Sequence, residues 1–309
     1  MAADRKTEKE ELRQKIKSLR KDRNAVILAH NYQNGEIQDI ADYVGDSLGL
    51  SQQAAKTDAE VIVFCGVKFM AESAKILSPQ KIVLLPEIES LCPMAGMVEP
   101  HGLREKKKQY PEAAVVTYVN STAEVKAESD ICCTSSNALK IVESIPEKQI
   151  LFVPDQNLGN YVAARTDKEI ITWNGYCTTH HRVKPEEIKK VKEKHPEAPI
   201  LVHPECVSGV VAGADYVGST AGILDYARNS KAQKLIIGTE QGLLHRLKKE
   251  NPDKRFYTLS PSLICPNMKK INLQKLADSL KNMETKIEIP EKIRKKAEQA
   301  LNRMLEVTG

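Results

Sequence analysis

Short apolar runs alternate with polar, helix-forming stretches along most of this chain. The clearest runs read AVILAHNY from Ala25, AAVVTYVN from Ala113 and APILVHPE from Ala198. Runs of this length, bounded by polar turns, are typical of buried strands. Strands that alternate with amphipathic helical stretches predict βαβ units with largely parallel sheets, and the expected fold class is therefore α/β.

The same order of elements recurs three times. Second strands are expected around Val44, Cys132 and Val217. Third strands are expected in VIVFCG, ILFVPD and LIIGTE, and fourth strands in KIVLLPE, EIITWNG and RFYTLSP. Polar helices are predicted at about 6–22, 98–109 and 184–195, before each unit, and a helical tail from Leu273. Three units that keep one register indicate an internal repeat.

The repeat predicts three α/β domains, related by a pseudo-threefold axis around a central site. The first would comprise residues 1–97 together with 271–309, the second 98–183 and the third 184–270. The helical tail is expected to pack back against the first domain. Each repeat has about 85 residues, a length within the usual range for a domain.

One cysteine closes each unit. Cys92, Cys177 and Cys265 are 85 and 88 residues apart, so three homologous units around one axis could bring three thiolates to one point. Thiolates select zinc or iron–sulfur clusters over hard metals. Three ligands would leave one iron of a [4Fe–4S] cluster open to act as a Lewis acid on a substrate oxygen. A three-cysteine zinc site with a bound water is the alternative metal site.

The cysteines outside this register have a different sequence context. Cys65, Cys132, Cys133 and Cys206 lie in or beside apolar strands and are expected to be buried, inert thiols. His180 follows Cys177 by three residues and would either lie next to the metal or support the ligand loop.

Polar side chains recur at the ends of the first strands. They are His30, Tyr118 and His203, two residues past the strand centres, and Tyr32, Asn120 and Glu205, four residues past them. Strand side chains alternate between faces, so the two members of each pair share a face. Ligands of parallel sheets gather beyond the carboxyl ends of the strands. Six such groups in register favour a shared site over six isolated structural residues.

Hydroxyl side chains recur after the second strands, where helices are expected to begin. They are Ser47, Ser135, Ser219 and Thr220. A hydroxyl at a helix start is an ordinary N-cap, but the same turn can bind a carboxylate or phosphate on its exposed N–H groups. Three such turns aimed at one site indicate a substrate with several anionic groups.

Composition narrows the class of protein further. The chain has 309 residues and a formal net charge of +5, and its basic residues are mixed with glutamate at helical spacing. This mixture is typical of solvated helix faces rather than of a nucleic-acid patch. The N-terminal stretch is charged and no apolar run approaches about 20 residues, so a cytoplasmic enzyme is expected. Seven cysteines in a long chain argue for free thiols or a metal, not a disulfide framework.

Many short motifs, in order from about residue 20 to 280, resemble the quinolinate synthase family. They are AHNYQ, GDSLGLS, VNSTAEVKA, CTSSNA, PDQNLG, WNGYC, HPEC, GSTAG, GTEQGLLHRL and CPNM. The resemblance implies three pseudo-threefold α/β domains with one [4Fe–4S] cluster near their common axis. It also implies a transferase that condenses iminoaspartate with dihydroxyacetone phosphate, releasing phosphate and water, to form quinolinate in de novo NAD biosynthesis.

The resemblance also implies roles for the residues in register. Cys92, Cys177 and Cys265 would be the cluster ligands, with an open iron as Lewis acid. The catalytic residues would be Tyr32, Glu205, His180 and Tyr118. The substrate-binding residues would be His30, Ser47, Tyr118, Asn120, Ser135, His203, Glu205, Ser219 and Thr220. Some family members carry further cysteines after the last ligand, but PNMKK follows Cys265 here, which argues against a thiol–disulfide switch.

Partners follow from the same resemblance. The substrates would be iminoaspartate and dihydroxyacetone phosphate, with a functional link to an aspartate oxidase or dehydrogenase that supplies the first. Neither nucleic acid nor membrane is an expected partner.

Two other classes of protein are compatible with three register-matched cysteines. A reductive dehydroxylase of isoprenoid synthesis would share the architecture but would need an electron donor. An iron–sulfur sensor without catalysis would need a concentrated basic face and would leave the polar pairs at His30/Tyr32 and His203/Glu205 without a purpose. The motif set favours quinolinate synthase over both.

Overall fold

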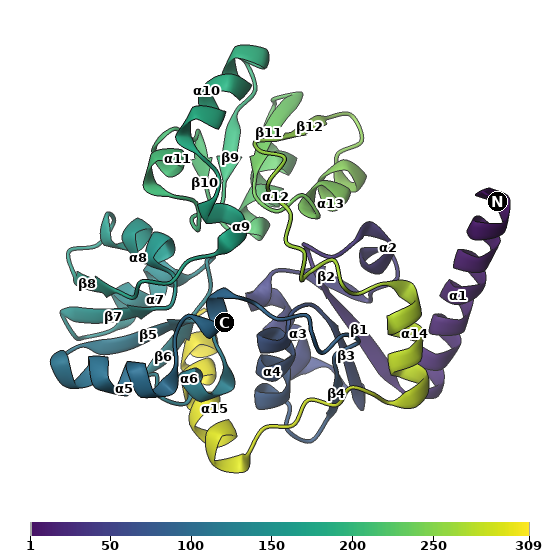
Figure 1. Ribbon diagram of the computed structural model, residues 1–309, viewed down its shortest axis with the longest axis horizontal. Coiled ribbons are helices and arrows are strands. Elements are labelled where there is room, and N and C mark those ends of the chain that lie inside the picture. Colours follow the sequence, from purple (N-terminus) through teal and green to yellow (C-terminus); the bar gives the residue numbers. More distant parts are fainter. Residues whose placement is uncertain (1, 309) are drawn as a thin grey trace. The chain divides into compact units, whose positions relative to one another are not determined.

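A computed structural model describes residues 2–308 of the chain (Figure 1). These residues form three four-stranded sheets, one in each predicted repeat, and every strand pair within the sheets is parallel. The strand orders are β2-β1-β3-β4, β6-β5-β7-β8 and β10-β9-β11-β12. In each sheet the first strand of the repeat therefore lies between the second and the third. The predicted α/β class with three related units is confirmed.

The strands form where the apolar runs predict them. The first strands of the repeats are β1 (Ala25–His30), β5 (Ala114–Tyr118) and β9 (Ile200–Val202). The second are β2 (Tyr43–Gly45), β6 (Ile131–Cys133) and β10 (Tyr216–Val217). The third are β3 (Val61–Cys65), β7 (Gln149–Val153) and β11 (Lys234–Gly238). The fourth are β4 (Ile82–Leu84), β8 (Glu169–Thr172) and β12 (Arg255–Thr258). All residues of β3 and β5 are buried, which explains their unbroken apolar sequences.

Helices connect and flank these strands. In the first repeat they are α1 (Ala2–Asp22), α2 (Gly35–Gln38), α3 (Ser47–Lys56) and α4 (Lys68–Leu77), followed by a short 3₁₀ helix, η1 (Met94–Gly96). The second repeat has α5 (Pro100–Gln109), α6 (Ala123–Lys126), α7 (Ala138–Ser144), α8 (Gln156–Ala163) and α9 (Thr178–His181). The third has α10 (Pro185–Lys194), α11 (Ser208–Ala212), α12 (Thr220–Asn229) and α13 (Leu243–Glu250), and the tail has α14 (Leu273–Asn282) and α15 (Glu291–Thr308). The three predicted polar helices correspond to α1, α5 and α10.

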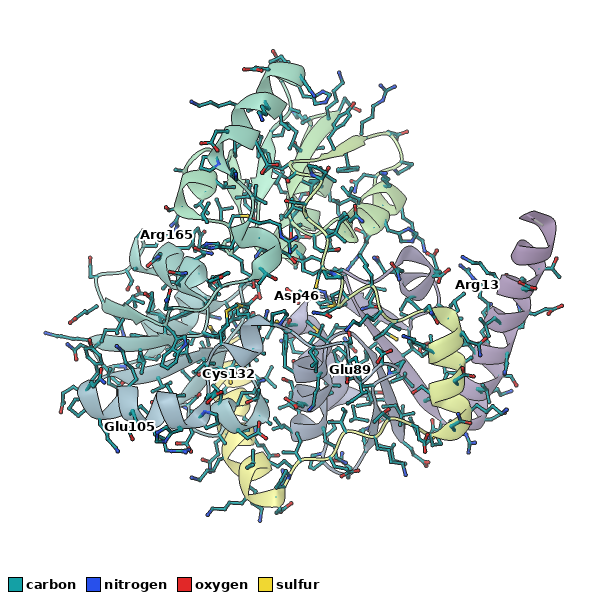
Figure 2. The ribbon with its side chains drawn as sticks, in the orientation of Figure 1. Arg13, Asp46, Glu89, Glu105, Cys132 and Arg165 are labelled. Atoms are coloured by element: carbon teal, nitrogen blue, oxygen red, sulfur yellow. The ribbon has the colours of Figure 1, made fainter. Side chains whose placement is uncertain are left out.

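Charged side chains cover the outer faces of the long helices (Figure 2). On α5, Glu105 and Lys108 form an exposed ion pair of 2.7 Å between neighbouring turns. Such pairs add little to stability but keep the helix face solvated. Within residues 2–308, the helices are too short or too polar to cross a membrane.

The described chain divides into two compact units. The first contains residues up to Cys92 together with Pro266–Glu291, and the second contains Pro93–Cys265 together with residues from Lys292 onward. The helical tail is divided between them: α14 packs against α1 in the first unit, whereas Arg303 of α15 donates a hydrogen bond of 2.7 Å to the Asp130 carbonyl in the second. The boundaries of the three domains stay a prediction.

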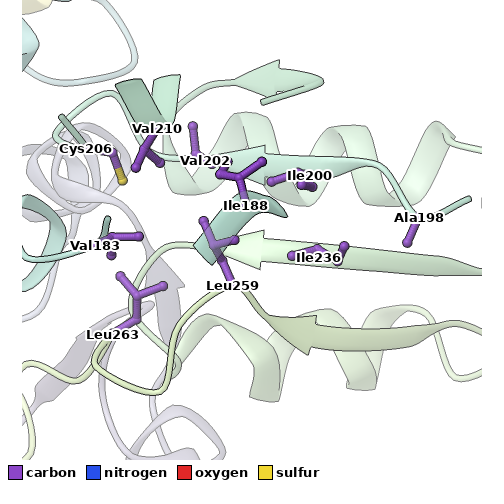
Figure 3. Packing of buried hydrophobic residues seen from close by; sticks show 10 residues of the cluster. All are labelled: Val183, Ile188, Ala198, Ile200, Val202, Cys206, Val210, Ile236, Leu259 and Leu263. Atoms are coloured by element: carbon purple, nitrogen blue, oxygen red, sulfur yellow. The ribbon is translucent and has the colours of Figure 1, made fainter. Parts of the chain in front are cut away.

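The core of the third repeat illustrates how the sheets are held (Figure 3). Ile200 and Val202 of β9 and Ile236 of β11 are fully buried against side chains of α10 and α11. Burial of each large aliphatic side chain contributes about 1.5–3 kcal/mol. Cys206 belongs to this apolar cluster, in agreement with its predicted role as a buried thiol.

Candidate active site

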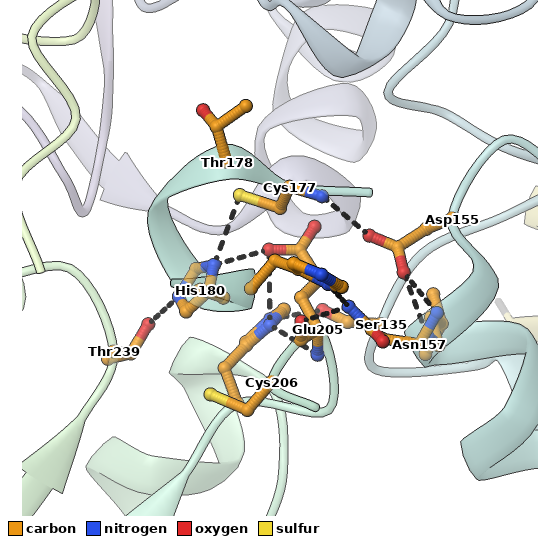
Figure 4. A network of polar contacts seen from close by, with 12 residues as sticks. Ser135, Asp155, Asn157, Cys177, Thr178, His180, Glu205, Cys206 and Thr239 are labelled. Carbon is orange, nitrogen blue, oxygen red and sulfur yellow. Dashed lines mark hydrogen bonds and ion pairs between the residues drawn. The ribbon is translucent and has the colours of Figure 1, made fainter. Parts of the chain in front are cut away.

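Buried polar side chains gather around Glu205 in the second compact unit (Figure 4). Glu205, His180 and His203 are 3%, 1% and 3% exposed. His180 Nδ1 lies 2.7 Å from Glu205 Oε2 and 3.2 Å from Cys177 Sγ. His203 Nδ1 lies 3.4 Å from the same carboxylate oxygen. The structure thus brings together four of the residues that the sequence analysis selected.

The turn after β9 orients the His203 side chain. Glu205 donates its backbone N–H to His203 Nδ1 at 3.3 Å. His203 Nε2, on the other side of the ring, lies 3.1 Å from Ser135 Oγ. The first repeat uses the same turn, since Tyr32 donates its backbone N–H to His30 Nδ1 at 3.2 Å. The same turn thus orients both histidines.

The short helix α9 positions His180. It begins directly after Cys177, and residues three apart lie on one helix face, so the imidazole lies beside the thiol. His180 Nε2 lies 2.9 Å from Thr239 Oγ1, and the His180 ring stacks on His203 with centroids 4.8 Å apart. Both ring nitrogens of His180 therefore have defined neighbours.

Two buried carboxyl groups near this network have opposite pKa shifts. Burial raises the pKa of Glu205, but the charges of His203 and His180 and their hydrogen bonds outweigh burial and hold it well below its ordinary value. Burial and the charge of Glu205 raise the pKa of Asp155 well above its ordinary value, although three backbone N–H groups oppose this shift. The negative charge therefore resides on Glu205. Within residues 2–308, Glu205 Oε1 has no hydrogen-bond partner.

Buried carboxyl groups also hold two of the three cysteine loops. Asp155 Oδ1 accepts the N–H groups of Asn157 and Leu158 at 2.8 and 2.9 Å, and its Oδ2 accepts the Cys177 N–H at 3.3 Å. Glu240 accepts the N–H groups of Cys265 and Gly242 at 3.1 and 2.7 Å. Asp155 and Glu240 are both 0% exposed. Each side chain thus fixes the backbone of a cysteine and does not contact its sulfur through these hydrogen bonds.

The sequence analysis missed these anchoring residues. Asp155 and Glu240 each lie two residues past the third strand of their repeat, and Val67 lies at the same position in the first repeat. An acidic residue at one register position in two repeats was the available signal. Asn157 was also missed: its Nδ2 donates to the Glu205 carbonyl at 2.9 Å and lies 3.0 Å from His181 Nδ1.

The predicted hydroxyls have several roles. Ser219 is the N-cap of α12 and accepts the Gly222 N–H at 3.2 Å, which is the ordinary structural role. Thr220 is the buried first residue of that helix. Ser135 contacts His203, whereas Ser47 follows Asp46, the residue that caps α3.

The remaining predicted residues lie at strand ends, as their register requires. Tyr118 ends β5 and is 4% exposed, and Asn120 follows it with a buried Oδ1 that lacks a hydrogen-bond partner among the described residues. His30 ends β1 and contacts the Tyr32 ring edge-on at a centroid distance of 4.5 Å. His30, Tyr32, Ser47 and Cys92 belong to the first compact unit, and the other predicted residues to the second.

The cysteines fall into two groups by burial. Cys92, Cys177 and Cys265 are partly exposed, whereas Cys65, Cys132, Cys133 and Cys206 are buried. Burial raises the pKa of Cys65 and of Cys132 to about 12, so these thiols stay protonated at neutral pH. Metals bind the thiolate, so only the partly exposed group suits a thiolate-bound metal. Among the described residues, Cys177, His180 and Glu205 offer ligand atoms within 4.8 Å of one another.

Known proteins resemble the chain over nearly its whole length. A family model described as quinolinate synthetase A protein matches residues 14–306. A quinolinate synthase of Alkaliphilus metalliredigens is 59% identical over 293 residues, which cover 94% of this chain and 97% of the relative. A quinolinate synthase of Geobacter sp. strain M21 is 56% identical, and quinolinate synthase 1 of Methanosarcina acetivorans is 55% identical. Each of these two alignments covers 96% of this chain and 98% of the relative.

Proposed function

We propose that this chain, which belongs to the quinolinate synthetase A family, condenses iminoaspartate with dihydroxyacetone phosphate to form quinolinate. One iminoaspartate and one dihydroxyacetone phosphate together lose one phosphate and two waters. The remaining atoms are those of the pyridine dicarboxylate product. Membership of the family makes the protein an enzyme of NAD biosynthesis. The family model's match to residues 14–306, nearly the full chain, supports this proposal. The cytoplasmic location stays a prediction.

Cys92, Cys177 and Cys265 would hold a [4Fe–4S] cluster. Three observations support this assignment: their common position in the repeats, their partial exposure, and the buried carboxyl groups that hold the backbone of Cys177 and Cys265. When bound, the cluster would supply a Lewis acid for a substrate oxygen.

Glu205 would accept protons during ring formation. Its carboxyl group is ionised because its pKa is held low, and the unpartnered Oε1 is the oxygen available to a substrate. His180 contacts the other oxygen and fixes the orientation of the carboxylate. Tyr32 would exchange protons with the condensing chain through its hydroxyl, and Tyr118 would assist. These are general acid–base roles, for which hydrogen-bond reach is the first requirement.

The remaining polar side chains would bind the substrate carboxylates and phosphate. His203 would contact the substrate through Nε2, which lies 3.1 Å from Ser135 Oγ. The other proposed binding residues are His30, Ser47, Asn120, Ser219 and Thr220. The buried carbonyl oxygen of the Asn120 side chain, without a partner among the described residues, is suited to an N–H or O–H donor of the substrate.

Anaerobic purification with iron, sulfide and quinolinate analysis tests the proposal. We expect about four irons per chain and quinolinate from dihydroxyacetone phosphate and freshly generated iminoaspartate. Four irons without quinolinate would favour a reductase or a sensor. Zinc in place of iron, with no quinolinate formed, would overturn the cluster and the reaction together.

Substitutions separate the proposed roles. Cys177→Ala should lose the cluster, as should the same change at the other two ligands, whereas Cys65→Ala and Cys133→Ala should keep it. Tyr32→Phe and Glu205→Gln should keep four irons and lose turnover. Four irons in Cys177→Ala would refute the ligand assignment, and normal rates in both acid–base variants would remove those roles.

A further inference from the structure

We propose that Cys177, His180 and Glu205 form a second metal site, which binds one Zn²⁺ in the cluster-free protein. The three side chains supply one sulfur, one nitrogen and one oxygen ligand, the donor types that zinc prefers. Their ligand atoms all lie within 4.8 Å of one another. This donor set shares only Cys177 with the proposed cluster site, so the two sites can be distinguished by substitution.

The distances suit a small tetrahedral ion. His180 Nδ1 lies 3.2 Å from Cys177 Sγ and 2.7 Å from Glu205 Oε2. Zinc bonds of roughly 2.0–2.3 Å at tetrahedral angles separate such ligand atoms by about 3.3–3.6 Å. His180 Nδ1 would move away from both neighbours by about half an ångström, whereas Cys177 Sγ and the Glu205 carboxylate, within 4.8 Å of one another, would move closer to share the ion. The ion would replace the proton between His180 and Glu205.

Charge and burial also favour a divalent cation. A Cys177 thiolate and the Glu205 carboxylate together neutralise Zn²⁺, and His180 and Glu205 are 1% and 3% exposed, so competition from water is weak. Cys177 is partly exposed and offers an entry path. Glu205 Oε1, buried and without a partner among the described residues, could complete a bidentate contact or hold a zinc-bound water.

Residues around the three ligands fix their orientation. With zinc on Nδ1, His180 carries its proton on Nε2 and donates it to Thr239 Oγ1, 2.9 Å away. Partners of this kind hold the imidazole in the ligating tautomer. Asp155 holds the backbone of Cys177, and Asn157 holds that of Glu205. His203 lies outside this group of three ligands, and water would take the fourth position.

Zinc at this site would exclude the cluster, because the Cys177 sulfur cannot serve both. This consequence rests on the proposed function, whereas zinc binding itself does not. In the cluster-free protein, cluster assembly on three cysteines would therefore compete with zinc binding through Cys177.

Zinc titration of the cluster-free protein, under reducing anaerobic conditions against a chromophoric zinc chelator, tests the site. We expect one tight equivalent, weakened at least tenfold by Cys177→Ala, His180→Ala and Glu205→Gln and unchanged by Cys92→Ala and Cys265→Ala. Thr239→Val, which keeps every ligand, should weaken binding less than His180→Ala. Far-ultraviolet circular dichroism of each variant checks folding.

Cobalt provides an independent readout. Co²⁺ on the same ligands should show a thiolate charge-transfer band that disappears in Cys177→Ala and persists in Cys265→Ala. Equal loss of zinc in the Cys92 and Cys265 variants would identify a three-cysteine zinc site and overturn the proposal. Absence of a tight equivalent in the wild-type protein would also overturn it.

Cluster reconstitution then tests the competition. One equivalent of zinc should block iron incorporation in the wild-type protein, and His180→Ala, which binds zinc weakly, should escape the block. Full incorporation into the zinc-loaded wild-type protein would refute the exclusion. If zinc binds as expected but zinc-free protein never takes up iron, the zinc site stands and the proposed cluster fails.

Discussion

Replacement of Asp155 by alanine should destabilise the protein more than loss of an ordinary helix cap. The change removes the acceptor of two N–H groups at the start of α8 and of the Cys177 N–H. Loss of the cap costs about 1 kcal/mol. A buried N–H left without its acceptor costs about 1–3 kcal/mol more, so the free energy of unfolding should fall by about 2–4 kcal/mol.

Asn272→Ala is the matched control. Asn272 caps α14 by accepting a single N–H, that of Lys275 at 2.9 Å, and its loss should cost only about 1 kcal/mol. Asp155→Asn should fall between the two. Its amide oxygen can keep the cap of α8, but its NH₂ group cannot accept the Cys177 N–H.

Urea unfolding of the cluster-free variants measures these differences, and iron retention after reconstitution provides a second readout. We expect both Asp155 variants to lose iron faster than the wild-type protein, and Asn272→Ala to lose it at the wild-type rate. Equal unfolding midpoints for Asp155→Ala and Asn272→Ala, together with unchanged iron retention, would refute the idea that this carboxyl group anchors the cysteine loop.

Two further predictions concern the cysteines and their loops. Iodoacetamide at pH 8 should modify the three proposed cysteine ligands of the cluster-free folded protein and spare the buried thiols, because burial raises the pKa of Cys65 and Cys132 to about 12. Mass spectrometry of peptides measures the modification, and a Cys65 that reacted as fast as Cys177 would contradict the prediction. Gly175→Ala should displace the Cys177 loop and reduce iron content, since its new Cβ would lie 2.5 Å from the Pro154 carbonyl oxygen. Gly96→Ala is the control, because a Cβ there would meet open space, and it should retain full iron content.

Local pattern was enough to predict the strands, because each is a short apolar run in a repeated frame. Register also identified Cys177, His203 and Glu205, since parallel strands bring their carboxyl ends to one edge, and His180 was selected by its spacing of three residues from Cys177. The sequence analysis did not identify Asp155 as an anchor, because an acidic residue before a helix is usually an N-cap. Its second contact, to Cys177, depends on a fold that brings residues 22 positions apart together.

The sequence pattern selected the hydroxyl residues but did not predict which contact each one makes. Ser219 matched the pattern for an anion-binding turn and for a cap, and the structure gives it the cap contact with Gly222. Ser135 lies one position later in its own repeat and contacts His203 instead. The difference lies in which side chains approach from other strands, and that information is not local in sequence.

The missing anchor in the first repeat bears on how the chain diverged after duplication. Where Asp155 and Glu240 lie in two copies, the first copy has Val67, and its loop is instead held by Ser90, whose Oγ donates to the Gly66 and Asn267 carbonyls at 3.0 and 2.7 Å. Equivalent loops are thus held by different chemistry. The three copies are no longer interchangeable, and grafting a loop from one copy into another would fail unless its own anchor moved with it.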